Sequence, residues 1–174
     1  MVYLQRAKLE HAQLWFSILE DNRAHLEPWL PNLKEIVDVT TAQAYVKKYA
    51  LLDIYLGIHI YEMWTEEGQI IGLATVHSGR FKDKSAELAY WLGTAYTGKG
   101  YATTACRHLI SMAFASHRLT GIKIRCLVDN IPSQQVAKRL GMQPLPREAN
   151  QLLFEIQKED WEQDADYWLW FLED

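Results

Sequence analysis

The sequence predicts a mixed α/β domain built on one sheet, and three observations lead to this prediction. Apolar residues recur at helical spacing between Leu9 and Leu19. From Gly57 onward the apolar period shortens to that of strands. A glycine-rich turn at residues 97–102 then joins a strand-like run to a helix-like run. Elements in this order indicate helices packed against a shared sheet.

Length and composition are those of one globular domain, which we expect to span residues 1–174. The chain has 174 residues, of which 49% are hydrophobic and 23% charged. Its net charge of −4 lacks the strongly basic footprint of a nucleic-acid-binding protein, so we expect no nucleic-acid partner. No apolar leader and no run of about 18 apolar residues is present. We therefore expect no membrane partner and a cytoplasmic location.

The cysteines and histidines are not spaced like metal ligands or a disulfide framework. Cys106 and Cys126 both lie in apolar periodic segments, which is typical of buried free thiols. His59 is isolated on a predicted strand, and His108 and His117 lie far apart on or near one predicted helix. We therefore expect surface or core histidines and no bound metal.

The first half of the chain continues with a helix and a hairpin. Thr40 or Thr41 is a candidate cap for a second helix. An apolar and aromatic run that begins near Ile58 predicts a strand, residues 66–68 a hairpin turn and residues 70–76 the partner strand. A polar turn at the following Phe81-Lys82-Asp83-Lys84 leads to the strand at residues 86–92 and the helix at residues 102–117.

The second half adds a strand, a short helix and a hairpin. Residues 122–128 alternate as a half-buried strand. Asn130 is placed to cap the next helix, which Gly141 closes. Apolar stretches at residues 152–156 and 167–172 predict a closing β-hairpin. The three tail tryptophans are explained by core packing or a dimer interface, and they are Trp161, Trp168 and Trp170.

The glycine-rich turn at residues 97–102 is an anion cradle at the start of a helix. Main-chain N–H groups converge there at the positive end of the helix dipole. The P-loop pattern fails because Gly100 stands where a magnesium-binding hydroxyl is needed, and the dinucleotide pattern fails because Thr103 occupies the third glycine position. Both failures disfavour a nucleotide-phosphate enzyme. A plain strand-to-helix turn is the alternative explanation for this loop on its own.

Segments 87–93, 98–102 and 128–142 together resemble the GCN5-related N-acetyltransferase (GNAT) superfamily. They are closest to its branch of ribosomal-protein-serine N-acetyltransferases of RimJ/RimL type, and residues 23–31 resemble the N-terminal helical region of that branch. Thr97 departs from the family loop, which usually begins with Gln or Arg. The resemblance implies a mixed, mostly antiparallel sheet flanked by helices.

The resemblance also implies acetyl-coenzyme A (acetyl-CoA) as the donor. Its pyrophosphate would lie on the N–H groups of residues 98–102, and its pantetheine arm would run along residues 90–92 like an added strand. The matching asparagine, Asn130, would contact the cofactor as well as cap its helix. The implied cofactor-binding residues are Tyr90, Trp91, Leu92, Thr97, Gly98, Lys99, Gly100, Tyr101, Ala102, Asn130 and Ser133.

Two residues are candidates for catalysis. Ser133 matches a serine that acts on the leaving thiolate, although a polar residue in the first turn of a helix needs no such role. Amine attack needs a neutral nucleophile, and Glu87, on one strand face with Ala89 and Trp91, is the first candidate for the base. A solvent-facing strand carboxylate is the alternative reading. Glu148 is a weaker candidate. The related branch is expected to carry a glutamate shortly after this position, but Asn150 stands at the aligned position here. A main-chain N–H near Leu92 would hold the oxyanion.

The function predicted by these residues is acetyl-CoA-dependent transfer of an acetyl group to a primary amine by direct attack. The acceptor would be a protein N-terminus or a small-molecule amine. The alternative is a non-catalytic acyl-CoA-binding or sensor module. A homodimer is an expectation from the branch alone.

Overall fold

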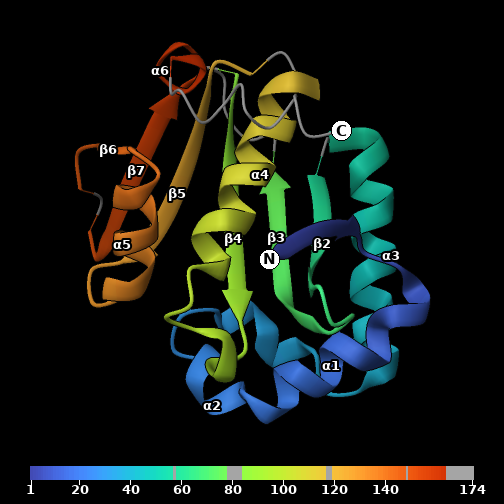
Figure 1. Cartoon of the computed structure of the whole chain (residues 1–174). Coiled ribbons are helices and arrows are strands. Elements are labelled where there is room, and N and C mark those ends of the chain that lie inside the picture. Colours follow the sequence, from blue (N-terminus) through green and yellow to red (C-terminus); the bar gives the residue numbers. More distant parts are fainter. Residues whose placement is uncertain (57, 78–83, 117–118, 148, 164–174) are drawn as a thin grey trace.

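A seven-stranded sheet organises the chain (Figure 1). The computed structural model describes residues 1–56, 58–77, 84–116, 119–147 and 149–163. The strands run in the order β1-β2-β3-β4-β5-β7-β6, and only the β4–β5 pair is parallel. Their bounds are β1 Val2–Arg6, β2 Ile58–Thr65, β3 Ile70–His77, β4 Ser85–Leu92, β5 Gly121–Leu127, β6 Gln143–Pro144 and β7 Gln151–Gln157. The predicted mixed, mostly antiparallel sheet is confirmed.

Helices follow β1, β4, β5 and β7. The α-helices are α1 Ala12–Asp21, α2 Arg23–Leu26, α3 Val39–Leu56, α4 Tyr101–Ser116, α5 Ile131–Arg139 and α6 Lys158–Glu162. Short 3-10 turns are η1 Leu9–His11, η2 Pro31–Glu35 and η3 Thr94–Tyr96. The helix α4 supplies the crossover that the parallel β4–β5 pair requires.

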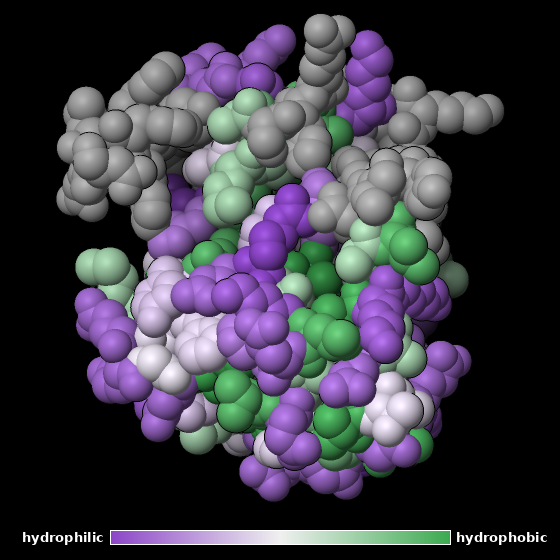
Figure 2. Space-filling view, turned by 90° about the vertical axis from the view of Figure 1, so that its right-hand side faces the viewer, coloured by the Kyte–Doolittle hydropathy of each residue, from purple (hydrophilic) through white to green (hydrophobic). Residues whose placement is uncertain are grey.

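Two hydrophobic cores lie on opposite faces of the sheet. One core contains Leu109 and Phe114 of α4, and the other contains Trp15 of α1 and Val46 of α3. The strand β4 contributes to both, because successive side chains of a strand point to opposite faces. Leu88 and Leu92 belong to the α4 core, whereas Trp91 belongs to the core under α1 and α3. Figure 2 views the molecule from the side of α3, where hydrophilic residues are interspersed with hydrophobic areas.

The structure corrects the predicted cap of the second helix. Neither Thr40 nor Thr41 is the cap, because α3 already begins at Val39. Asp38 caps it instead: its Oδ1 accepts a hydrogen bond from the N–H of Thr41 at 2.7 Å. Thr41 Oγ1 in turn accepts one from the N–H of Asp38 at 3.0 Å. This reciprocal pair satisfies two otherwise unpaired donors.

The two ends of the sheet differ from the prediction. The edge strand β1 was not predicted, because only Val2 of its five residues is fully buried and its apolar pattern is short. At the other end β7 is confirmed, but it pairs with β5 and β6, and α6 follows where a polar turn was expected. The predicted second arm at residues 167–172 lies outside the described residues.

Trp161 and the two cysteines are buried as expected. Trp161 is 1% exposed, and its Nε1 donates to Ser111 Oγ at 3.2 Å, which confirms core packing for this tryptophan. Trp168 and Trp170 lie outside the described residues. Cys106 and Cys126 are free thiols in the interior.

Candidate active site

The strands β4 and β5 form a fork in the sheet. Their parallel pairing runs from Ser85↔Gly121 to Leu88↔Ile124 and then stops, although β4 continues to Leu92 and β5 to Leu127. Figure 1 shows the two strands diverging beyond this point. Each strand stays paired on its other side, β4 with β3 and β5 with β7. The main chain of β4 beyond Leu88 is therefore open to an extended ligand on the β5 side.

A groove of about 640 Å³ occupies this fork. A volume of this order suits a cofactor-sized ligand. Almost all of the residues predicted to bind the cofactor line it, namely Tyr90, Trp91, Leu92, Thr97, Gly98, Gly100, Tyr101, Ala102, Asn130 and Ser133. Lys99 is not part of the lining, and its Nζ instead lies 5.8 Å from the centre of the Tyr96 ring.

The predicted glycine turn leads directly into α4. Gly98 and Gly100 have φ values of +73° and +82°, a conformation that side chains other than glycine rarely adopt. No atom lies within 4 Å of the position where a Cβ would be at either glycine, so the turn is open toward the groove that both residues line. The first N–H groups of α4 follow at Tyr101, at the positive end of a helix of 16 residues. This turn fits a phosphate-bearing ligand.

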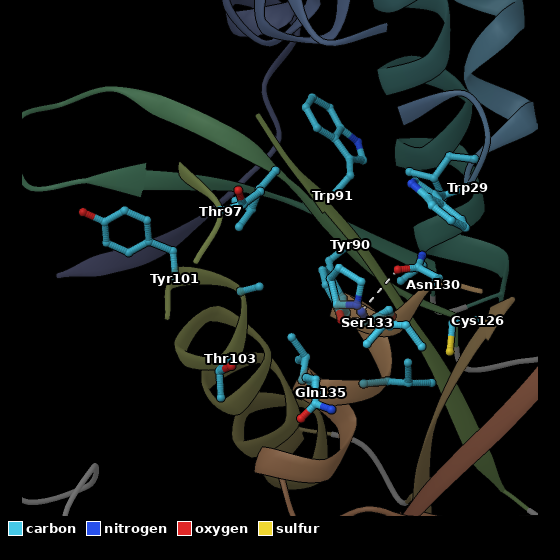
Figure 3. A pocket seen from close by; sticks show the side chains of 18 of the residues that line it. Trp29, Tyr90, Trp91, Thr97, Tyr101, Thr103, Cys126, Asn130, Ser133 and Gln135 are labelled. Carbon is cyan, nitrogen blue, oxygen red and sulfur yellow. Dashed lines mark hydrogen bonds between the residues drawn. The ribbon is translucent and has the colours of Figure 1, made fainter. Parts of the chain in front are cut away.

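Asn130, Ser133 and Tyr90 meet in the middle of the groove (Figure 3). Asn130 caps α5, as predicted, by accepting a hydrogen bond from the N–H of Ser133 at 3.2 Å. Because the cap uses the main chain of Ser133, its hydroxyl remains available and lies 3.1 Å from the hydroxyl of Tyr90. Burial raises the pKa of Tyr90, so this phenol stays protonated. The sequence did not point to this hydroxyl pair.

Cys126 lies close to this hydroxyl pair and was not predicted as a groove residue. Burial raises the pKa of its thiol, although a hydrogen bond with Ser133 acts in the opposite direction. A neutral thiol contributes a polarisable, apolar surface to the groove rather than a nucleophile.

Glu87 lies outside the groove. It lines a second, smaller cavity of about 170 Å³ together with Ala89 and Trp91, and these three residues share one face of β4 as expected. Its Oε1 lies 3.6 Å from Nε of Arg125, a residue that lines the groove. The carboxylate therefore sits at the fork, next to the groove. Glu148 lies outside the described residues, and Asn150 lines neither cavity.

A helical segment in which no site residue was predicted covers one end of the groove. Its lining residues are His25, Leu26, Trp29 and Leu30. Arg23 ties this segment down by donating to the carbonyl oxygens of Ile36 at 2.7 Å and Leu33 at 3.3 Å. The recurrence of His25 with Trp29 and of Leu26 with Leu30, each at helical spacing, is the signal that marks this face.

Asn22 connects the N-terminal helices to the glycine turn. Its Oδ1 accepts a hydrogen bond from the N–H of Thr94 at 2.7 Å, and its Nδ2 donates to the carbonyl oxygen of Ile18 at 2.8 Å. The chain leading from β4 to α4 is therefore held against the end of α1. This contact joins two parts of the chain that are distant in sequence, and it helps to hold the residues of the groove in place.

Two findings bear on metals and membranes. Within the described ranges, no group of three or more His, Cys, Asp or Glu side chains is placed to hold a metal ion. Nor is any helix in that part of the chain both long and apolar enough to span a bilayer.

Among the histidines, His108 is buried on α4, where burial and the neighbouring charge of Arg107 lower its pKa to about 4.

The sequence matches the family described as acetyltransferase (GNAT) domain over residues 2–143. It is also 36% identical over 76 residues to the ribosomal-protein-serine acetyltransferase of Escherichia coli (strain K12). That match covers 44% of this chain and 42% of the relative. The chain thus matches about two-fifths of the length of the first curated relatives.

Solved structures share the fold at low sequence identity. Mycobacterium smegmatis RimJ in complex with CoA-disulfide superposes with a TM-score of 0.83 at 22% identity, covering 98% of this chain and 88% of that one. The microcin C7 self-immunity acetyltransferase MccE, in complex with acetyl-CoA and AMP, gives a TM-score of 0.81 at 19% identity, with coverage of 90% and 92%.

Proposed function

The chain belongs to the acetyltransferase (GNAT) domain family, and from this premise we propose that it is an acetyl-CoA-dependent N-acetyltransferase. It transfers the acetyl group directly to a primary amine, without a covalent enzyme intermediate. The observation that carries the proposal is the fork between β4 and β5, where one groove joins the glycine turn of α4 to the Asn130–Ser133 turn of α5.

The groove residues fit coenzyme A in kind and in size. The N–H groups of residues 98–102 would hold the pyrophosphate, since the open space at Gly98 and Gly100 lets an anion approach the main chain. The unpaired edge of Tyr90, Trp91 and Leu92 would hydrogen-bond the pantetheine amides. When bound, acetyl-CoA supplies a thioester that is reactive toward amines. Relatives of this fold that bind coenzyme A or acetyl-CoA support the assignment.

Ser133 is the proposed proton donor to the leaving thiolate. Its hydroxyl lines the groove and is paired with that of Tyr90 at 3.1 Å. The protonated hydroxyl of Tyr90 would polarise that of Ser133, and the proton that Ser133 gives to the sulfur is made up by the one that the attacking nitrogen releases. A main-chain N–H near Leu92 is the proposed oxyanion donor.

Glu87 is the proposed base that takes a proton from the acceptor ammonium, directly or through a water molecule. An ammonium has no lone pair, so this deprotonation must precede attack. The carboxylate is only partly exposed and lies at the fork, one residue before the end of the β4–β5 pairing.

The acceptor is a protein N-terminus or a small-molecule amine. The name of the Escherichia coli relative, a ribosomal-protein-serine acetyltransferase, supports a polypeptide acceptor. We further propose one catalytic domain spanning residues 1–174, a cytoplasmic location and assembly as a homodimer.

The proposal is tested by measuring thiol release from acetyl-CoA in the presence of a broad panel of peptides and small amines. Mass spectrometry of the products identifies the acetylated amine. We expect release above background with at least one class of amine. Background release across the whole panel, with acetyl-CoA bound, would refute an enzymatic role.

One observation favours a second candidate, a non-catalytic acyl-CoA sensor. The carboxylate of Glu87 lies outside the groove and has a cationic neighbour in Arg125. A sensor binds acetyl-CoA tightly, and neither Ser133→Ala nor Glu87→Gln changes any transfer rate. An acetyltransferase transfers the acetyl group more slowly in both variants.

A further inference from the structure

We propose that the closed end of the fork between β4 and β5 is a pocket for the acyl group of the donor, and that Cys126 limits this group to the length of acetyl. We call it the acyl pocket. Its residues all line the groove, and they are Leu88, Tyr90, Ile124 and Cys126. The inference rests on the proposed function, because it states which acyl-CoA the groove selects.

The register of the fork arranges these four residues as two facing pairs. Leu88 and Ile124 form the last pair of the parallel ladder. Alternate residues of a strand share a face, so Tyr90 and Cys126, two residues further along, lie on the same side of the sheet. All four side chains belong to the core that contains α4 or pack against it. The acyl pocket therefore opens at the second pair, where the strands have separated, and ends at the first.

Ser133 marks the level at which the sulfur of the donor would lie. Its hydroxyl is 3.1 Å from that of Tyr90, and it also contacts the thiol of Cys126 (Figure 3). The glycine turn follows the end of β4 along the chain, so a donor held there by its pyrophosphate would run along β4 toward Leu88. Beyond the sulfur only the acyl group remains, and it would point into the closed end.

The distance between the two pairs limits the length of the acyl group. Two residues of a strand span about 7 Å, and carbon atoms in contact stay about 4 Å apart, so about 3 Å remain for the acyl group. An acetyl group needs no more than this beyond the sulfur. A longer chain would push against Leu88 and Ile124, which are each 1% exposed and belong to a densely packed core.

The lining of the acyl pocket is apolar or neutral. Two of its side chains are hydrocarbon, and burial raises the pKa of Cys126 and of Tyr90, so the thiol and the phenol stay protonated. Arg125 is next to Cys126 in sequence, but strand alternation places it on the other face, where it lies 3.6 Å from Glu87. A carboxylate-bearing acyl group such as succinyl would therefore be buried here without a partner.

The binding of CoA thioesters of increasing length tests the inference without relying on turnover. We expect acetyl-CoA to bind at least about tenfold more tightly than butyryl-CoA, since extra methylenes overpack a filled interior. Succinyl-CoA should bind more weakly than acetyl-CoA as well. Isothermal titration calorimetry measures the affinities. Equal affinities for acetyl-CoA and butyryl-CoA would overturn the inference.

Cys126→Ala should allow a longer acyl group to bind. The substitution removes one sulfur atom from the wall and makes room for about one methylene. We expect the affinity for propionyl-CoA to rise at least about fourfold relative to acetyl-CoA, which is the value of burying one methylene. The ratio compares two ligands in the same variant, so a loss of stability does not produce it. An unchanged ratio in folded Cys126→Ala would contradict the role of Cys126.

Two variants control for size and for position. Cys126→Ser keeps the size of the side chain and should keep the original preference for acetyl-CoA. Cys106→Ala makes the same truncation at a buried cysteine of α4 that does not line the groove, and it should also keep the preference. A gain of propionyl-CoA binding in either control would show that the size of Cys126 does not set the selection.

The position of the acyl group can be observed directly. In the complex with acetyl-CoA labelled at its methyl group, we expect NMR contacts between this methyl and the methyl groups of Leu88 and Ile124. Contacts to Trp29 or Ile131 instead would place the acyl group at other walls of the groove and overturn the inference.

These outcomes keep the inference distinct from the proposed function. Selective binding of acetyl-CoA without acetylation of any amine would refute the enzyme and support the acyl pocket. Propionyl and butyryl groups that bind and are transferred as well as acetyl would refute the acyl pocket alone. A chain that binds none of these CoA thioesters would refute both.

Discussion

The two faces of β4 differ in how each is built. On the α4 side, the groove is lined by main-chain groups at two helix starts, the turn at Gly98–Gly100 and the cap at Asn130. On the α3 side, the cavity beside Glu87 is lined by side chains from separate elements, with Tyr45 and Tyr49 above the pair of strands β3 and β4. Under the proposed function, this difference means that backbone geometry would recognise the donor and side-chain chemistry the acceptor. Substitutions on the two faces of β4 should therefore impair different steps of the proposed reaction.

The largest effect is expected from Gly100→Val. The residue has φ +82° and lines the groove, so a branched side chain both strains the turn and fills the approach to its N–H groups. We expect the affinity for acetyl-CoA to fall by at least about 100-fold, which corresponds to about 2.7 kcal/mol. Isothermal titration calorimetry measures it.

Gly68→Val is the matched control for the glycine turn. Gly68 has φ +75° and open space around its Cβ position, but it lies in the β2–β3 hairpin away from the groove. This variant should lose stability and still bind acetyl-CoA normally. Normal binding by Gly100→Val would remove the pyrophosphate from this turn.

Glu87→Gln should damage the acceptor side alone. Loss of a base lowers rates by about 100-fold or more, so we expect kcat/KM for the amine to fall to that extent while acetyl-CoA affinity is unchanged. Glu155→Gln is the control, since Glu155 is a similarly buried strand carboxylate that lies 3.5 Å from Lys123. Equal, measurable rates for the original chain and Glu87→Gln would assign the base to another group.

Ser133→Ala should lower kcat by about tenfold, because Tyr90 and water partly replace a lost hydroxyl donor. The helix cap survives in this variant, since Asn130 accepts from the main chain of residue 133. The pH dependence of single-turnover rates measures the effect. Ser111→Ala removes a buried hydroxyl outside the groove and should alter stability without altering this rate. A Ser133→Ala enzyme with full activity would assign proton donation elsewhere.

The smallest effect concerns His108, which is buried on α4. His108 has a pKa of about 4 in the folded chain, below the usual value near 6.5, so the unfolded chain binds its proton first. Stability is therefore complete above about pH 6.5 and falls as the pH drops toward 4. Urea unfolding should show about 1 kcal/mol more loss between pH 7.5 and 5.5 than His108→Gln does. Identical pH slopes would contradict this role.

The same contrast between the two faces of β4 explains which parts of the site could be predicted from the sequence. A positive-φ glycine next to a helix start, or an asparagine cap with proline behind it, is a local requirement, so Gly98, Gly100 and Asn130 stand out in the chain. The fold class followed from these motifs and from apolar periodicity. Helix α3 begins earlier than predicted only because Asp38, which precedes both threonines, completes a reciprocal cap with Thr41.

The cavity beside Glu87 could not be predicted, because it depends on the long-range register of β3 and β4. His77 meets Glu87 only through the β3–β4 pairing, and Tyr49 reaches them only when α3 packs over that pair. None of these residues forms a motif with its sequence neighbours. The Tyr90–Ser133 hydroxyl pair was missed for the same reason, since it joins a strand to a helix across the fork.

A crystal structure with a bisubstrate analogue, in which coenzyme A is joined through an acetyl bridge to the nitrogen of serinamide, tests the account most directly. The account predicts that the pyrophosphate lies on the turn at residues 98–102, and that the serinamide arm crosses β4 at Ala89 to reach the cavity beside Glu87. An arm that leaves the groove on the α4 side, with the cavity beside Glu87 unfilled, would contradict it.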